Sequence, residues 1–166
     1  MKHPNLLALD LGTKTGWATL DESLLGSRIE SGVQTFDLGR GESPGMRFIR
    51  FNVFLREMLN NIEPQIVFYD QPITAAGHGG GYAAELLTGM ATRVQEQCAE
   101  RRIEHVGVWG STLKKWATGK GNAKKPAMIA RAQELFPAVK ILNDDHADAL
   151  LLLRYGEEKF CPKEDR

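Results

Sequence analysis

The stretch NDDHADALLLL, residues 143–153, joins three aspartates and a histidine to a run of four leucines. The leucines are typical of the buried side of a helix, so the aspartates would lie at its amino-terminal end. Charged groups are costly to bury unless they are paired or bind a metal ion. The stretch therefore predicts a packed helix whose first turn carries acids that need an explanation.

Two explanations are open for these acids. Aspartate is favoured at helix N-caps and suits the helix dipole, which predicts Asp144 as the N-cap. Asp145 and Asp148 are three residues apart, which places them on one helix face about 4.5 Å apart along the axis. Two carboxylates at that spacing repel each other, and a divalent cation bound between them would remove the repulsion.

The rest of the chain is predicted to form a mixed α/β sheet covered by helices. The first three strands should form an antiparallel meander, because their connections are short and rich in turn residues. One domain is expected over residues 1–157, followed by a charged tail at 158–166. The predicted elements are strands at 5–12, 15–21 and 28–38, a helix within 41–64, a strand at 65–70, a helix at 82–102, a strand at 103–110, helices at 111–117 and 124–135, and the helix of residues 143–153.

The composition of the 166 residues, 42% hydrophobic and 25% charged, is that of a soluble globular protein. No apolar run reaches the roughly 20 residues of a membrane span, and Asp10 interrupts the first apolar stretch. Cys98 and Cys161 show neither metal-ligand spacing nor a disulfide framework. We therefore expect a cytoplasmic protein with no membrane partner.

Charge is unevenly distributed although the net charge is zero. Residues 111–131 contain six lysines and arginines and no acid. Such a segment is either a solvated basic face or a surface that contacts phosphates.

Acids also end two predicted strands. Asp10 closes the first strand and Asp70 the fourth, and sites in α/β sheets form where strands end. Taken singly, Asp10 could be a turn residue and Asp70 a strand terminator. Together with Asp145 and Asp148 they predict a magnesium site, where two ions roughly 3.5–4 Å apart could activate a water and stabilise the leaving oxygen of a phosphodiester.

Three motifs carry a resemblance to a known family. LALDLGTKTGWA (7–18), VFYDQP (67–72) and DDHADALLLL (144–153) resemble the RuvC-type Holliday junction resolvases of bacteria and their phages, members of the ribonuclease H-like superfamily. The resemblance implies a ribonuclease H-like mixed five-stranded sheet flanked by helices. By its motifs, the resemblance implies these metal ligands: Asp10, Asp70, Asp145 and Asp148.

The resemblance also implies an activity. We expect a Mg²⁺-dependent endonuclease, with about two ions per active site and Mn²⁺ able to substitute, that cuts four-way DNA junctions in recombination and repair. Its paired nicks should leave 5′-phosphate and 3′-hydroxyl ends. A homodimer is expected because the junction is nearly two-fold symmetric. The candidate interface is helix 82–102, through Tyr82, Leu86, Leu87, Met90 and Val94.

Lysines of the segment LKKWATGKGNAKKPAM (113–128) resemble the family's two lysines on either side of a glycine-rich turn. The resemblance implies that Lys125 is catalytic, beside the scissile phosphate, and that Lys114 contacts this phosphate or a neighbour. Lys115, Lys120 and Lys124 are further candidates for DNA binding, with a solvated basic face as the alternative.

Two features depart from the family. Asp70 stands where the family has glutamate, so its carboxylate lies one methylene nearer the backbone, and a misplacement of about 1 Å can cost on the order of 100-fold in rate. The loop ITAAGHGGG (73–81) lacks the aromatic wedge of the bacterial members. His78 could stack on a base there, or be merely solvated.

His146 lies about 100° around the helix from Asp145 and is expected outside the metal site.

Three other functions remain open. DLGTKTG (10–16) is similar to the phosphate loop of the actin–hexokinase–sugar kinase group, although those proteins have two such domains and typically twice this length or more. A RuvX-like nuclease that acts on RNA shares the early acidic motif. A module that binds branched DNA with a weakened metal site is the non-enzymatic alternative.

Overall fold

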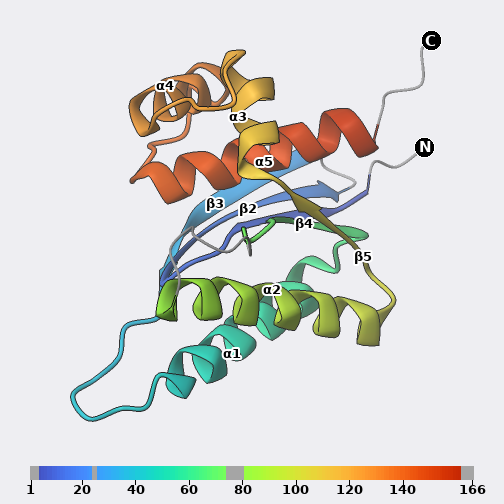
Figure 1. The fold of residues 1–166 in the computed structure, drawn as a ribbon. Coiled ribbons are helices and arrows are strands. Elements are labelled where there is room, and N and C mark those ends of the chain that lie inside the picture. Colours follow the sequence, from blue (N-terminus) through green and yellow to red (C-terminus); the bar gives the residue numbers. More distant parts are fainter. Residues whose placement is uncertain (1–3, 24–25, 74–80, 162–166) are drawn as a thin grey trace.

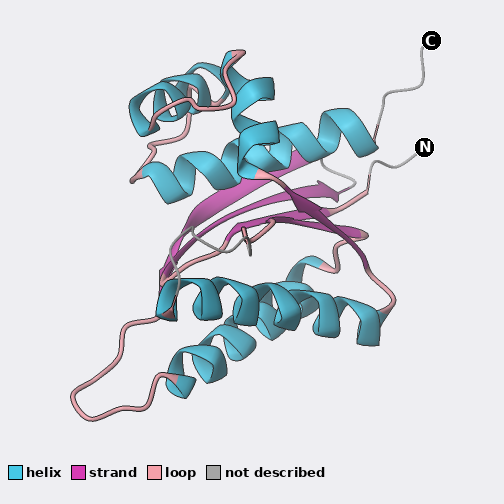
Figure 2. Cartoon of the chain, viewed as in Figure 1, coloured by secondary structure: helices cyan, strands magenta, loops and turns pink. Residues whose placement is uncertain are grey.

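The structure is a computed structural model that describes residues 4–23, 26–73 and 81–161. A five-stranded sheet lies between two layers of helices (Figures 1 and 2). The elements are β1 (Leu6–Asp10), β2 (Lys14–Ser23), β3 (Gly26–Thr35), α1 (Gly45–Ile62), β4 (Ile66–Asp70), α2 (Tyr82–Arg101), β5 (Glu104–Val108), α3 (Gly110–Thr118), α4 (Lys125–Leu135) and α5 (Asp144–Phe160).

The strand order is β3-β2-β1-β4-β5. β1, β2 and β3 are antiparallel, whereas β4 and β5 continue the sheet parallel to β1. The reason is the length of the connections: a few residues join β1 to β2, whereas β4 and β5 are each reached through a helix. The predicted meander and the predicted mixed sheet are confirmed.

Side chains of the central strands alternate between the two layers. Leu6, Ala8 and Phe68 belong to the core beneath α5, whereas Leu7 and Leu9 belong to the core that faces α1 and α2. Continuing the alternation puts Asp10 on the face of Ala8, and Asp70 on the face of Phe68. The strand-end acids therefore face α5.

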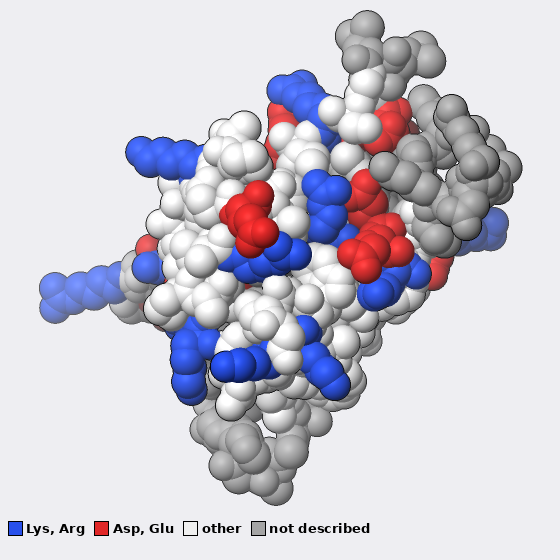
Figure 3. All heavy atoms as spheres, turned by 90° about the horizontal axis from the view of Figure 1, so that it is seen from above, with Lys and Arg blue, Asp and Glu red and all other residues white. Residues whose placement is uncertain are grey.

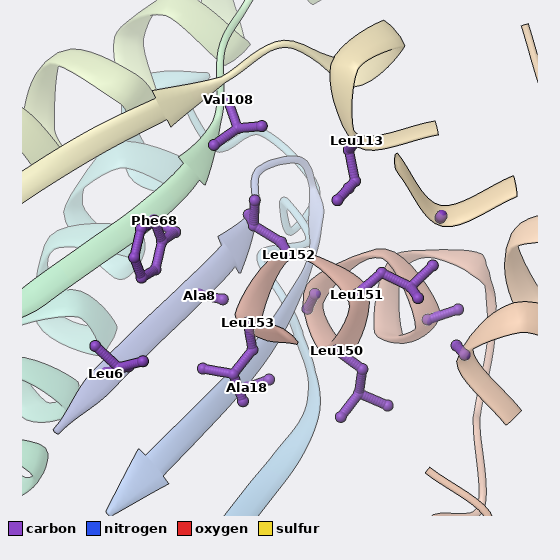
Figure 4. Close-up of a cluster of buried hydrophobic side chains, with 14 of the residues drawn as sticks. Leu6, Ala8, Ala18, Phe68, Val108, Leu113, Leu150, Leu151, Leu152 and Leu153 are labelled. Carbon is purple, nitrogen blue, oxygen red and sulfur yellow. The ribbon is translucent and has the colours of Figure 1, made fainter. Parts of the chain in front are cut away.

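Helix α5 crosses the sheet beneath α3 and α4 (Figure 1). Its consecutive residues Leu150, Leu151, Leu152 and Leu153 are at most 2% exposed. Four consecutive positions turn through most of a helix circumference, so burial of all four requires neighbours on several sides. The sheet supplies one side and the helices α3 and α4 supply the others (Figure 4). The leucine run is thus explained by packing.

Two predicted features differ in the structure. The candidate dimer interface on α2 is wrong for Leu86, Met90 and Val94, which are buried against the sheet and α1 and are unavailable to a partner. Tyr82, which is 45% exposed, and the partly buried Leu87 are not excluded by their burial. Helix α5 continues to Phe160, so the first residues of the expected tail are helical. Within the described ranges, the helices include none long and apolar enough to cross a membrane.

Candidate metal centre

The four predicted acids come from two strand ends and one helix start. Asp10 and Asp70 end the adjacent parallel strands β1 and β4, whose register pairs Leu9 with Tyr69. Asp145 and Asp148 lie in the first turns of α5, which packs on β1 and β2. Each carboxyl group of Asp70, Asp145 and Asp148 is close enough to Asp10 to raise its pKa. The structure therefore brings together the acids that the sequence places up to 138 positions apart.

Gly16 permits this convergence. It pairs with Asp10 across the β1–β2 ladder, and the backbone of α5 approaches it directly. A Cβ atom at Gly16 would lie 1.9 Å from the carbonyl oxygen of Asp145 and 2.4 Å from its carbon. Only glycine leaves room for this contact, so Gly16 sets how closely the start of α5 approaches the strand-end acids.

The pKa values of the acids reflect their crowding. Burial, followed by the negative charges of the three other acids, raises the pKa of Asp10 well above its ordinary value. Burial raises the pKa of Asp70 to about 7 and that of Asp148 to about 6, and also raises that of Asp145. The four carboxyl groups cannot all ionise at neutral pH unless positive charge offsets their repulsion.

Hydrogen bonds hold two of the carboxyl groups. The Leu11 N–H donates to Asp70 Oδ1 at 2.6 Å, and the Asp10 and Asp145 carboxyl groups interact, which raises the pKa of Asp10 and opposes the rise in that of Asp145. With these bonds in place, no three His, Cys, Asp or Glu side chains within 4–23, 26–73 and 81–161 are arranged to hold one metal ion together.

The donor set nevertheless fits a hard divalent cation. Carboxylate oxygens are the ligands that Mg²⁺ prefers. Asp148 Oδ1 is buried and has no hydrogen-bond partner in the described structure. A buried carboxylate oxygen without a partner is unfavourable, and a bound cation would satisfy it.

Asp144 differs from its expected role. The N-cap of α5 is Asn143, whose side chain accepts the His146 N–H at 2.9 Å, so the prediction of Asp144 as N-cap is wrong. Asp144 instead forms an ion pair with Lys125, with 2.7 Å between Oδ2 and Nζ. The charge of Lys125 lowers the pKa of Asp144 and also favours ionisation of Asp145 and Asp148. Lys125 therefore lies beside the acids.

The other candidate lysines differ in their distance from the acids. The charge of Lys114 on α3 opposes the rise in the pKa of Asp148, which places Lys114 near the site. Lys115, Lys120 and Lys124 are exposed, and the last two line a hollow of about 570 Å³ between α3 and α4. On the face viewed in Figure 3, the lower part carries basic side chains without acidic ones, whereas basic and acidic side chains are mixed in the central and upper parts. A surface region with basic and no acidic side chains suits contacts with an extended polyanion.

Two histidines, His146 and His78, were considered as possible site residues. His146 is buried, its Nδ1 accepts the Leu142 N–H at 3.1 Å, and its Nε2 lies 2.8 Å from Ser31 Oγ. Both ring nitrogens are thus used within the protein, in agreement with the expectation that His146 lies outside the metal site. His78 lies outside the described residues.

Sequence reasoning missed Lys14, which begins β2. Its charge contributes to the lowered pKa of Asp144 and opposes the rise in the pKa of Asp145, so it lies close to the start of α5. It stands inside the DLGTKTG motif, four residues after Asp10. The turn after β1 could have indicated that Lys14 returns to the same sheet edge, but only the packing of α5 shows which acids it meets.

Because the acids bind protons in the folded protein, we predict that its free energy of unfolding depends on pH. Between about pH 4 and 7 the folded protein retains protons on Asp70 and Asp148 that the unfolded chain releases, so without divalent ions its stability falls as pH rises. We expect Mg²⁺ to offset the ionised acids. The difference in free energy of unfolding between Mg²⁺ and chelator should grow, on the order of 3 kcal/mol, from pH 5 to pH 8.

Thermal unfolding in Mg²⁺ and in chelator at each pH measures this difference. Groups outside the site, such as His146, contribute equally in both conditions and cancel. A Tm that is indifferent to Mg²⁺ at pH 8 would contradict a cation site at these acids.

Comparisons with known proteins show the fold. No family model and no curated protein sequence matches the chain. Among solved structures, Thermus thermophilus RuvC is 17% identical with a TM-score of 0.69, covering 90% of each chain. T. thermophilus RuvC in complex with Holliday junction substrate is 17% identical with a TM-score of 0.71, covering 91% of each chain. The yeast mitochondrial Holliday junction resolvase Ydc2 is 13% identical with a TM-score of 0.61, covering 89% of this chain and 75% of the other.

Proposed function

We propose that this chain, which has the fold of the RuvC-type Holliday junction resolvases, is a metal-dependent endonuclease that nicks four-way DNA junctions. One observation carries the proposal: acids from β1, β4 and α5 meet at one point beside Lys125 and Lys114. The fold alone is compatible with many activities, so the chemistry of this site decides among them.

The four acids would together hold about two Mg²⁺ or Mn²⁺ ions. These acids are Asp10, Asp70, Asp145 and Asp148. When bound, the ions supply Lewis-acid stabilisation of a phosphodiester and lower the pKa of water. Lys125 would offset the negative charge that develops on the phosphate, and Lys114 would neutralise the same or a neighbouring phosphate. The expected products carry 5′-phosphate and 3′-hydroxyl ends.

Asp144 would hold Lys125 at the site before DNA binds. Their ion pair keeps the Lys125 ammonium within reach of Asp145 and Asp148 although the Lys125 side chain is 76% exposed. A phosphate that enters the site would then compete with Asp144 for the ammonium. Lys115, Lys120 and Lys124, which are exposed on α3 and on the segment between α3 and α4, are proposed to contact phosphates of the DNA arms.

Paired cuts require two active sites. A four-way junction is nearly two-fold symmetric, so a C₂ homodimer is the proposed active form. The buried side of α2 cannot supply its interface.

One observation favours a second function, a module that binds branched DNA without cutting it. Asp70 is one methylene shorter than the glutamate of the resembled family, and its carboxylate is engaged by the Leu11 N–H. If that bond persists when DNA and metal bind, Asp70 is a poor ligand and cutting is slow. This module would bind junctions as well in chelator as in Mg²⁺.

The deciding experiment incubates the purified protein with end-labelled four-way junction, fork, linear duplex and structured RNA, in Mg²⁺ or in chelator. We expect symmetric nicks in opposing junction strands, in Mg²⁺ only, that DNA ligase can reseal because they carry 5′-phosphate and 3′-hydroxyl ends. Junction binding without cutting in Mg²⁺ or Mn²⁺ would favour the binding module. Cutting of RNA instead of DNA would favour a RuvX-like activity.

A further inference from the structure

Trp109 is an exposed aromatic residue at the same sheet edge as the four acids. Its side chain is 51% exposed, although tryptophan is usually well buried. It directly follows Val108, the register partner of Asp70 in the parallel β4–β5 ladder. The Gln71 N–H donates to the Val108 carbonyl at 2.8 Å, which ties the two strand ends together.

The ladder geometry bounds the distance from Trp109 to the acids. Adjacent strands lie about 4.8 Å apart and each residue advances a strand by about 3.3 Å, so the Cα atoms of Trp109 and Asp70 are about 6 Å apart. This is less than two steps of about 3.4 Å between successive nucleotides along one strand of a duplex. The backbone of Trp109 therefore lies within two nucleotide steps of a phosphate held at the acids.

The backbone of Trp109 is fixed although its ring is exposed. Its carbonyl accepts the Leu113 N–H at 3.1 Å, which opens α3, and both Val108 and Leu113 are buried. Val108 packs in the core beneath α5, on the side of the sheet that the acids face. Alternation therefore directs the indole of Trp109 to the opposite side of the same sheet edge, where it would meet a neighbouring base and not the phosphate at the acids. Ile73, 58% exposed, follows the neighbouring strand β4. A fixed backbone lets an exposed ring stack without a large loss of conformational entropy.

The surrounding charge favours nucleic acid as the partner. Residues 105–143 contain seven lysines and arginines and a single acid, Glu134. Helix α3, which begins next to Trp109, carries Lys114 and Lys115. An apolar protein partner would leave these charges uncompensated, whereas nucleic acid offers both phosphates for the lysines and bases for the indole.

We propose that Trp109 stacks on an unpaired DNA base next to the phosphate held at the acids, and so contributes selectivity for branched over fully paired DNA. The inference rests on the proposed function for its substrate, but concerns recognition and not cutting. Stacking needs a base that is free of its own stack, which a junction centre supplies and a continuous duplex does not.

The test measures binding in chelator, where cutting does not interfere. Junctions that carry a fluorescent base at positions around the branch point report stacking directly. Trp109→Ala should bind the four-way junction about tenfold more weakly and bind linear duplex unchanged. Trp109→Phe should retain most of the affinity. Ile49→Ala, which truncates a side chain that is 57% exposed on α1, is the matched control and should change neither affinity.

The outcomes are distinct. Unchanged junction affinity of Trp109→Ala overturns the stacking role, even if the wild-type protein cuts junctions. An equal loss for junction and duplex overturns it in favour of a general backbone contact. Sedimentation of the variants detects the other alternative: a dimer that Trp109→Ala dissociates, with no change in base fluorescence, would make Trp109 a contact between copies of the chain. Wild-type protein that binds junctions without cutting them contradicts the nuclease proposal and leaves the stacking proposal standing.

Discussion

Replacing Asp10 with asparagine is expected to lower the rate of junction cutting by more than about 100-fold. Replacing residues that surround metal ligands typically costs 10–100-fold in affinity or activity, and Asp10 is proposed to be a ligand itself. Junction binding in chelator should be retained or strengthened, because one negative charge that opposes the phosphates is removed. Asp148→Asn should behave in the same way, since it removes the carboxylate whose Oδ1 is buried without a partner.

Stability separates loss of a ligand from loss of the fold. The pKa of Asp10 is raised well above its ordinary value, so its ionisation opposes folding at neutral pH. Asp10→Asn should therefore melt at a higher temperature than the wild type in chelator at pH 8, and gain less from Mg²⁺. Asp37→Asn makes the same chemical change at an exposed position and should alter neither property. A near-normal cutting rate of Asp10→Asn would contradict the metal-centre assignment.

Replacing Gly16 with alanine is expected to have the largest effect on structure. The new Cβ would lie 1.9 Å from the Asp145 carbonyl oxygen, and an ordinary contact begins near 3.4 Å, so the two backbones must separate by about 1.5 Å (3.4 − 1.9). Overpacking costs about 3 kcal/mol at the upper end of its usual range, and the obstacle here is backbone, which cannot rotate away. This corresponds to a fall of about 10 °C in Tm for a chain of this length.

The same shift should disable the site. Movement of the α5 start carries Asp145 and Asp148 away from Asp10 and Asp70, so cutting and stabilisation by Mg²⁺ should both be lost. Gly110→Ala is the control, because a Cβ at Gly110, the first residue of α3, meets no atom within 4 Å. It should leave Tm unchanged or slightly higher. Retention of the wild-type Tm and Mg²⁺ response by Gly16→Ala would show that α5 is not held as described.

Most of the fold could be predicted from local patterns. Alternating apolar residues predict strands, apolar residues at helical spacing predict helices, and short connections predict the meander. Positions that depend on a neighbouring element could not be predicted in this way. The apolar side of α2 reads equally as core or as interface, and only its packing against the sheet and α1 decided for core. Likewise, Asn143 and Asp144 are both good N-caps by type, and the ion pair with Lys125 distinguishes their roles.

Some positions in the candidate site could likewise be predicted from local patterns, and others could not. The positions of Asp10 and Asp70 at strand ends, and their common face with Ala8 and Phe68, follow from the alternation of a strand, which is a property of the local chain. The proximity of Lys14 and Lys114 to the acids follows from the packing of α3 and α5, to which no local pattern refers.

The sequence by itself determined which residue types stand at which ends of which elements, because backbone periodicity and turn chemistry act over a few neighbours. Only the tertiary structure decided that four like charges share one location, because their separation along the chain is bridged by contacts such as that of Gly16 with the start of α5. The packing of the leucines of α5 on the sheet holds those charges together against their repulsion.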